Sequence, residues 1–566
     1  MATRSRLGRR RGAPFATSVF GVVGIAVGCA SDGAAPRAGG ADNEGSTGTG
    51  TISGATGGSP IGASGGSTGT GGPGADAGAE PGDSDEDPPL PPEREARGAF
   101  RAPVTTGRLV WTANPASGRV ALIDSENLKV TVLDAGLGPT HLAALNDPSG
   151  EADVAIVLNV LGRDATLFRV AEDGGVSSET FPTHEQANRL TVSPGGSFAI
   201  AWTDFREFDA PDPTDGFQDV TVIEIGAGSA RVSRVSVGYR PSEIAFDAEE
   251  TRAFAVTEPG VSVIALGEGE ATVTDLIELT DGASSGAAAR DVAISANGEY
   301  AFVRVDGMSE ISVVSLRDGE RTPVVLSGPV TDLDLSEDGR RAVAVVRSNR
   351  EIAVIPVPEI LDAPTDFDSL EIPGEAFGLV SLSPDASRIL LFMNAVASDR
   401  VTIVDGSAGE TYLDYRTVTV HSPVENVSVA PDGRNALVEQ VPVETSTKPG
   451  AFSIVPLDVE RAPKIVATDA PLHSVAFMPG ADSDRAVVTV RSDSPPFAAM
   501  HLVRLPTLQV DPLSLASPPI ASGIVAESRK AYVAQEHPEG RITFVDLDSG
   551  EARTLTGFEL AVKVVE

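Results

Sequence analysis

The chain has 566 residues, with 59 Gly, 41 Pro and only 5% aromatic residues. Its 80 acidic and 43 basic side chains give a formal net charge of -37, which repels phosphate backbones and anionic lipid surfaces. The charge therefore disfavours nucleic-acid binding and polybasic membrane docking, and we expect no nucleic-acid partner.

The N-terminus has the pattern of an export signal. Five arginines lie within the first eleven residues, before an apolar stretch from Pro14 to Gly28 that is shorter than the about 20 residues of a membrane-spanning helix. The stretch ends in Ala26-Val27-Gly28-Cys29, which resembles the lipobox of bacterial lipoproteins, although that family usually has Leu where Ala26 stands. In the lipobox the cysteine receives lipid and becomes the mature N-terminus.

Cys29 is the only cysteine, which excludes an intrachain disulfide, a cysteine-based zinc site and thiol catalysis elsewhere. We therefore predict that residues 1–29 are a lipoprotein signal peptide, that Cys29 is the lipid attachment site, and that the lipid binds the protein to a membrane. The predicted location is the bacterial cell envelope, as an outer-membrane lipoprotein facing the periplasm or the cell surface. An ordinary signal peptide cleaved near Ala30 is the alternative.

Residues 30–107 are predicted to be a disordered tether. They are nearly all Gly, Ser, Thr, Ala, Pro and acidic residues, which cannot bury enough apolar surface to offset the entropy lost on folding. The run Pro88 to Pro92 is expected to stiffen into polyproline II next to the folded domain. A proline-motif ligand for a partner domain is the alternative function of that run.

Beyond Arg101 the sequence repeats itself as alternating apolar strands joined by Pro, Asp, Asn and Gly turns. The first turn of each unit recurs every 41 to 54 residues, the length of one four-stranded propeller blade. We predict an all-β fold in which residues 108–566 form a single closed β-propeller. Ten units are counted, within a range of seven to ten. The turns are anchored at Asn146, Ser193, Asp247, Ser295, Ser336, Ser383, Ala430, Met478 and Ala526.

The segment from Val110 to Ala143 resembles the YVTN-type propeller repeat. Trp111-Thr112-Ala113-Asn114 stands where that family has Tyr-Val-Thr-Asn, and Ile123-Asp124 stands where it has Ile-Asp. Tyr532 to Gln535 with Val545-Asp546 repeats the pattern, as does Val401 to Asp405. The resemblance covers most of the chain after Arg108 and implies the fold more than an activity.

The two ends of the repeat region predict how the ring closes. The first unit begins at Arg108 without an inner strand, and the chain ends in an unpartnered segment from Gly557 to Glu566. Pairing these two segments would complete one blade and remove the open sheet edges.

Two groups of residues are candidates for a site. His141 and His473 are each predicted at the start of an inner strand, near a face of the channel, but the six histidines have no metal-binding spacing. Asp209, Asp212 and Asp215 recur every third residue in the longest insertion, a pattern that could bind calcium. A solvated acidic loop is the alternative, and we predict no catalytic residue.

These observations favour a lipid-anchored propeller that acts as a binding or scaffold module for protein or glycan, rather than an enzyme. The resemblance also implies an alternative, because some similar propellers are lactonase-type hydrolases with metal-binding carboxylates over the central channel. A purely structural envelope role is a third possibility.

Overall fold

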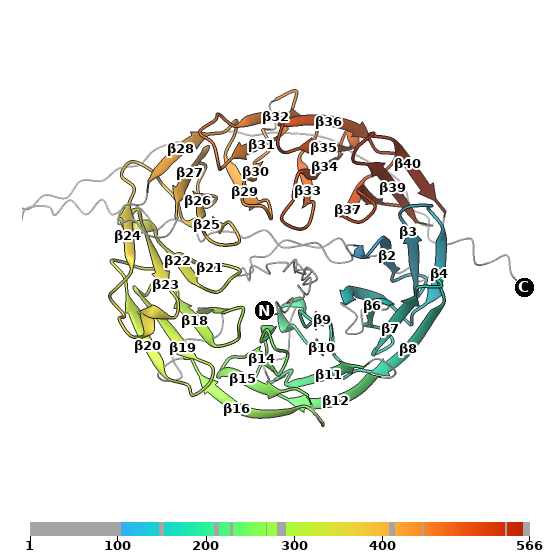
Figure 1. Ribbon diagram of the computed structural model, residues 1–566, viewed down its shortest axis with the longest axis horizontal. Helices are drawn as coiled ribbons and strands as arrows, with labels where there is room; N and C mark the ends of the chain where they lie inside the picture. The colour runs from blue at the N-terminus through green and yellow to red at the C-terminus, as the bar shows by residue number, and fades with distance from the viewer. Residues whose placement is uncertain are drawn as a thin grey trace, which may run out of the picture. The chain divides into compact units, whose positions relative to one another are not determined.

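A computed structural model describes residues 103–145, 152–208, 214–226, 230–267, 269–279, 290–406, 414–443, 446–537 and 540–557. These residues form ten sheets, each of four antiparallel strands in sequential order. The sheets stand around a ring as the blades of a β-propeller (Figure 1). The predicted all-β propeller is confirmed, with ten blades.

The first five blades span β1 to β20. Blade 1 has β1 (Val104–Thr106), β2 (Leu109–Asn114), β3 (Arg119–Asp124) and β4 (Val130–Asp134); blade 2 has β5 (Pro139–Leu145), β6 (Ala152–Asn159), β7 (Asp164–Ala171) and β8 (Val176–Pro182). Blade 3 has β9 (Arg189–Val192), β10 (Phe198–Trp202), β11 (Asp219–Ile225) and β12 (Ala230–Ser236), with the short helix η1 (Phe205–Glu207) after β10. Blade 4 has β13 (Glu243–Phe246), β14 (Arg252–Val256), β15 (Gly260–Ala265) and β16 (Thr272–Glu278); blade 5 has β17 (Arg290–Ile294), β18 (Tyr300–Val305), β19 (Glu310–Ser315) and β20 (Arg321–Val325).

The other five blades span β21 to β40. Blade 6 has β21 (Asp332–Leu335), β22 (Arg341–Val346), β23 (Glu351–Pro356) and β24 (Asp368–Glu371), with the short helices η3 (Arg347–Asn349) and η4 (Glu359–Leu361); blade 7 has β25 (Leu379–Leu382), β26 (Arg388–Phe392), β27 (Arg400–Asp405) and β28 (Tyr415–Thr419). Blade 8 has β29 (Val424–Val429), β30 (Asn435–Gln440), β31 (Gly450–Pro456) and β32 (Lys464–Thr468). Blade 9 has β33 (Leu472–Phe477), β34 (Arg485–Asp493), β35 (Pro496–Arg504) and β36 (Gln509–Ser514); blade 10 has β37 (Pro519–Val525), β38 (Lys530–Gln535), β39 (Arg541–Asp546) and β40 (Ala552–Thr556).

Burial follows the position of each strand in its blade. The first strand lies next to the central channel and the fourth forms the outer rim, as β9 and β12 illustrate (Figure 1). Second strands are nearly continuous apolar runs, because both of their faces pack against neighbouring blades: every residue of β10 is buried. Fourth strands are polar, and in β16 only Ile277 is buried.

The hydrophobic core lies between the blades. Between blades 1 and 2, for example, the fully buried rings of Trp111 and Phe168 lie with their centroids 6.1 Å apart. The Trp111 indole N–H donates a hydrogen bond of 2.8 Å to the Thr106 hydroxyl. Each blade therefore depends on its neighbours for burial, as in other repeat folds.

The ring closes by packing, and the prediction of a blade split between the two chain ends is wrong. Blade 1 has its own inner strand, β1, in which Val104 pairs with Trp111. A strand of three residues carries no repeat signal, which is why the sequence pattern begins only at residue 108. The predicted partner segment runs from Gly557 to Glu566, and all of it after Gly557 lies outside the described residues.

Contacts between blade 10 and blade 1 join the ends of the ring. Apolar side chains from both blades form one buried cluster that includes Ile123 and Phe544. The Tyr532 hydroxyl donates a hydrogen bond of 2.9 Å to the Pro103 carbonyl, and the Lys530 ammonium donates one of 2.6 Å to the Ser125 carbonyl. In the described part of the chain, no helix is long and apolar enough to span a bilayer.

Candidate functional site

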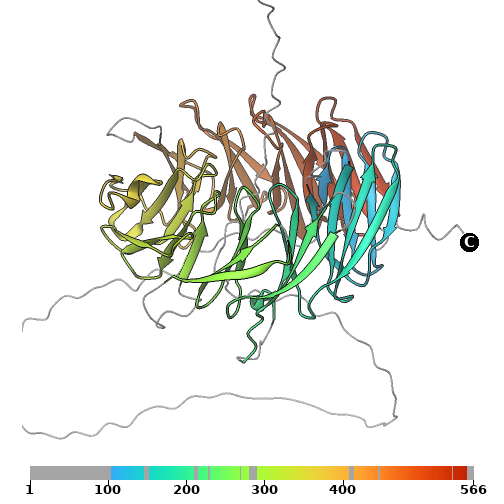
Figure 2. The same ribbon diagram turned by 60° about the horizontal axis from the view of Figure 1, so that its bottom comes forward.

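The antiparallel order of the strands gives the propeller two distinct faces (Figure 2). One face, which we call the turn face, carries the turns from first to second strand and from third to fourth strand. The opposite face, the loop face, carries the second-to-third connections and the links from one blade to the next. The described ends of the longest insertion, residues 204–208 and 214–218, lie on the loop face because they join β10 to β11.

Buried polar side chains hold the turn face together. The predicted turn anchors Ser193, Ser295, Ser336 and Ser383 are each at most 3% exposed, and each hydroxyl accepts a hydrogen bond of 2.9–3.0 Å from the backbone N–H five residues later. Their role as turn corners is confirmed. Gly298 illustrates how closely successive turns approach: its φ is +64°, and a Cβ there would lie 2.6 Å from the Asp247 side chain.

The aspartates of the YVTN-like pattern are also turn-face residues with a structural role. Asp124 accepts hydrogen bonds from the backbone N–H groups of Glu126 and Asn127, and Asp546 accepts the equivalent bonds from Asp548 and Ser549. Side-chain to backbone bonds of this kind begin tight turns. The residues that carry the resemblance thus build the blades.

Three of the arginines on the loop face join their blade to the next one. The guanidinium of Arg206 in blade 3 donates a hydrogen bond of 2.8 Å to the Ser242 carbonyl, at the entry to blade 4. Arg304 in blade 5 and Arg491 in blade 9 make equivalent bonds of 3.4 Å and 3.2 Å to carbonyls of the following blade. The guanidinium groups of these three arginines are thus fixed by hydrogen bonds between blades.

Two carboxyl groups on neighbouring inner strands have raised pKa values. Both lie at the channel mouth on the loop face. Glu243 is the first residue of β13 and Asp291 the second residue of β17, and both are partly buried. Burial and the nearby Asp291 carboxylate raise the pKa of Glu243 to about 8, although the Arg206 guanidinium opposes the shift. Burial also raises the pKa of Asp291, even though the Arg304 guanidinium lies 3.7 Å away.

Four inner strands carry a β-bulge at the same loop-face end. The register shifts in β5, β29, β33 and β37 each leave one residue unpaired, and these residues are Thr140, Glu425, His473 and Ile520. Bulges of this kind re-aim side chains beside functional sites. The four residues lie at the mouth of the channel, at least partly exposed.

The predicted positions of both histidines at the start of inner strands are confirmed. His473 is the bulged residue of β33, and its Nε2 lies 3.0 Å from the Ile520 carbonyl of the next blade. His141 follows the bulge of β5. No group of three or more metal-ligating side chains occurs among residues whose placement is described.

The proposed calcium site remains a prediction, because only one of its three aspartates is described. Asp209 and Asp212 lie outside the described residues, as does Cys29. Asp215 is described and partly exposed, and its backbone carbonyl accepts a hydrogen bond of 3.2 Å from Arg240.

A buried histidine that no sequence motif singles out lies beneath the loop face. His184 links blade 2 to blade 3, and its ring nitrogens lie 3.2 Å and 2.9 Å from the hydroxyls of Thr221 and Thr203. Burial lowers the pKa of His184 to about 4. An uncharged, fully hydrogen-bonded imidazole of this kind stabilises the junction between the blades.

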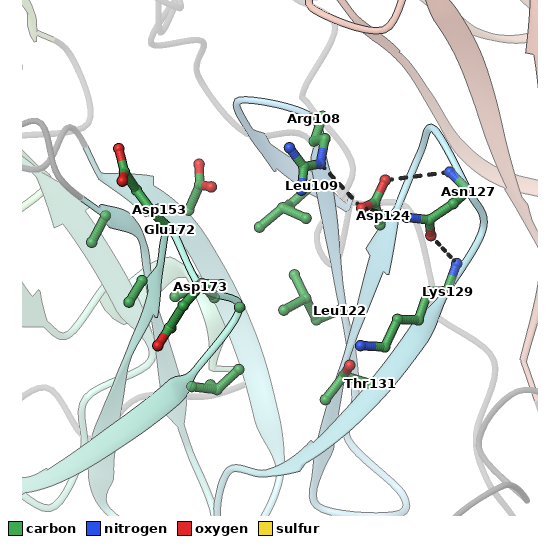
Figure 3. Close-up of a pocket in the computed structure, with 15 residues that line it drawn as sticks. Arg108, Leu109, Leu122, Asp124, Asn127, Lys129, Thr131, Asp153, Glu172 and Asp173 are labelled. Atoms are coloured by element: carbon green, nitrogen blue, oxygen red, sulfur yellow. Dashed lines mark hydrogen bonds and ion pairs between the residues drawn. The ribbon is translucent and has the colours of Figure 1, made fainter.

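The turn face carries a cleft of about 510 Å³ between blades 1 and 2 (Figure 3). Arg108 and Lys129 line its blade 1 wall, and Asp153, Glu172 and Asp173 line its blade 2 wall. Burial raises the pKa of Asp153, although the Thr106 hydroxyl hydrogen-bonds to its carboxylate. Sequence reasoning missed this cleft and the Glu243–Asp291 pair, because each joins residues from different blades.

Comparisons with known proteins give no family. No family model and no curated protein matches the chain. A solved structure of the dihydro-heme d1 dehydrogenase NirN in complex with DHE is similar at 15% identity and a TM-score of 0.37, over 82% of this chain and 77% of that one.

Two further solved structures are similar to a comparable degree. Hydrazine synthase of Kuenenia stuttgartiensis matches at 12% identity and a TM-score of 0.30, over 65% of this chain and 95% of that one. A eukaryotic initiation factor matches at 12% identity and a TM-score of 0.45, over 68% of this chain and 92% of that one. Identities this low carry no information about activity.

Proposed function

We propose that this protein is a lipid-anchored binding or scaffold module of a bacterial cell envelope, and that it recognises protein or glycan through its loop face. The N-terminal signal pattern, the lipobox-like Cys29 and the Gly-rich tether support delivery to the envelope. The observation that carries the choice of face is the pair of partly buried carboxyls, Glu243 and Asp291, at the channel mouth.

The chemistry of this pair suits polar, uncharged groups. A carboxyl with a pKa of about 8 keeps its proton at neutral pH, so Glu243 both donates and accepts hydrogen bonds. The Asp291 carboxyl group supplies further acceptors, and the Arg304 guanidinium, 3.7 Å from it, supplies further donors. Sugar hydroxyls and peptide amides carry the complementary groups, and loops on a rigid scaffold are where such recognition is usually located.

Co-sedimentation with purified peptidoglycan sacculi tests the proposal for a glycan ligand, and co-sedimentation with outer-membrane vesicles tests it for a protein ligand. We expect the full chain to bind one of the two, and the double substitution Glu243→Gln with Asp291→Asn to weaken binding about tenfold. The exposed turn-face substitution Asp318→Asn serves as the control and should change nothing. Equal binding by all three proteins, or no binding to either material, would contradict the proposal.

Lipid attachment has its own test. Cells expressing the full chain should incorporate radiolabelled palmitate into the protein, and Cys29→Ala should abolish this incorporation. Persistent labelling of the Cys29→Ala variant would show that the anchor is elsewhere.

The same pair of carboxyls favours one alternative, a lactonase-type hydrolase with a metal near the channel. Paired carboxyl groups with separated protonation states can act as acid and base in hydrolysis. The protein would be a hydrolase rather than a binding module if it hydrolysed γ-lactones and lost this activity both on chelation and in the double variant. The absence of hydrolysis in protein loaded with calcium or zinc would eliminate it.

A further inference from the structure

The two walls of the cleft between blades 1 and 2 differ in charge. Arg108 and Lys129 lie on the blade 1 wall together with Asp124, whereas Asp153, Glu172 and Asp173 line the blade 2 wall, which has no cation among its described residues (Figure 3). A second cavity of about 510 Å³ lies on the same face between blades 8 and 9, but there a single wall mixes Asp432 and Asp458 with Arg434 and Arg461. The two cavities therefore differ in how their charged side chains are distributed.

The charged groups of the blade 1 wall are not equally available. Arg108 is engaged with Asp124, with an Nε–Oδ2 distance of 3.1 Å. Lys129 is exposed, and its ammonium makes no hydrogen bond or ion pair with any described residue. Lys129 is thus the group on this wall that can bind an anion without breaking an existing pair.

On the blade 2 wall, hydrogen bonds that begin at a core residue hold the Asp153 carboxylate in place. The Trp111 indole donates to the Thr106 hydroxyl, which in turn hydrogen-bonds to the Asp153 carboxylate. This chain of hydrogen bonds fixes the carboxylate against a buried aromatic residue. A preorganised carboxylate loses little freedom when it binds a cation.

The volume and lining of the cleft suit a small ligand. Its volume lies in the about 300–1,000 Å³ range of small-molecule sites, and its floor contains the apolar side chains of Leu109, Leu122 and Val170. A cation facing carboxylates across such a floor orients a dipolar ligand, with its carboxylate toward Lys129 and its amino group toward Asp153. We propose that the blade 1–2 cleft binds short peptides with free amino and carboxyl ends.

Titration calorimetry of the full chain with three peptides tests this proposal. The probes are Ala-Leu-Ala with free ends, its N-acetyl form and its C-terminal amide. We expect the free peptide to bind about fivefold more tightly than either blocked form, the effect of losing one solvent-exposed ion pair. Identical binding of the three peptides, or the absence of saturable binding, would overturn the proposal.

Two substitutions assign the ends of the peptide to the walls. In Lys129→Ala the amide should bind as well as the free peptide, while the N-acetyl form stays weaker. In Asp153→Asn, which keeps the side-chain shape, the N-acetyl penalty should disappear instead. If both variants discriminate as the wild type does, the cleft is not the site.

A matched control comes from the second cavity, where Arg461→Ala should leave all three affinities unchanged. A loss of discrimination in this variant would move the peptide site to blades 8 and 9. Because the cleft is on the turn face, its test is independent of binding at the loop face.

Discussion

The loop face and the turn face are built by the same ten repeats, yet they use their polar groups differently. On the turn face the buried serines and aspartates accept hydrogen bonds from their own turns, as Ser383 does from the Arg388 N–H. On the loop face Glu243 and Asp291 remain partly exposed, with pKa values raised by burial. The contrast indicates that the recurring turn residues hold the ring together, and our proposal assigns recognition to residues that do not recur from blade to blade.

The largest expected effect is a loss of protein stability caused by a substitution on the turn face. Asp247 is 1% exposed and accepts hydrogen bonds of 2.8 Å and 2.9 Å from the N–H groups of Thr251 and Arg252, with the Arg252 guanidinium 3.1 Å away. We expect Asp247→Ala to cost about 3 kcal/mol, because it leaves several partly buried donors without their acceptor. Ser383→Ala, which removes a single acceptor, should cost about 1 kcal/mol.

Urea unfolding measures both stabilities, and sedimentation with envelope material measures binding. The comparison between the faces predicts that both variants bind normally under conditions in which they are folded. A folded Asp247→Ala protein that no longer bound would place recognition on the turn face.

An effect of intermediate size is expected from Glu243 on the loop face, which should make the stability of the protein depend on pH. The pKa of Glu243 rises from 4.5 to about 8 on folding, so the folded chain holds this proton more tightly than the unfolded chain. The contribution of Glu243 to stability is therefore greatest below about pH 4.5 and falls as the pH rises toward 8. Glu243→Gln should remove this dependence.

At pH 8 we expect Glu243→Gln to be more stable than the wild type by on the order of 2 kcal/mol. This is less than the full pKa shift of Glu243 implies, because the side chain is partly solvated. Near pH 4.5 the two proteins should be equally stable. Glu320→Gln, an exposed turn-face change, is the control. Parallel pH profiles for the wild type and Glu243→Gln would show that Glu243 ionises as it does in water.

The weakest effect is expected where the ring closes. Tyr532→Phe removes the hydrogen bond to the Pro103 carbonyl and should cost about 1 kcal/mol. Because that bond joins blade 10 to the entry of β1, hydrogen exchange should accelerate in residues 104–106 before it does elsewhere. Tyr415→Phe, at an exposed tyrosine, is the matched control. Unchanged exchange in β1 would mean that the apolar cluster alone closes the ring.

The fold was largely predictable from the sequence, because each blade repeats the same turn chemistry. Ser193, Ser295, Ser336 and Ser383 mark four of the blades, and the count of ten units was right. The closure was mispredicted, because β1 is too short to show an alternating pattern.

The candidate sites were less predictable, for a different reason. Asp291 acts on Glu243 from the next blade, and Asp153 and Lys129 line the two walls of a cleft between blades. Such pairs depend on how the ring brings successive repeats together, and a single repeat contains only half of each. Of the site residues expected from the sequence, only the positions of His141 and His473 could be followed to the channel mouth.

Carboxyl footprinting distinguishes the loop face from the turn face as the recognition surface. The protein would be labelled with a carbodiimide and an amine, free and bound to sacculi or vesicles, and the modified residues read by mass spectrometry. Binding through the loop face predicts protection of the exposed carboxylates Glu425 and Asp306, with Asp318 and Glu172 on the turn face labelled as before. Protection of Asp318 and Glu172 while Glu425 and Asp306 stay reactive would contradict recognition through the loop face.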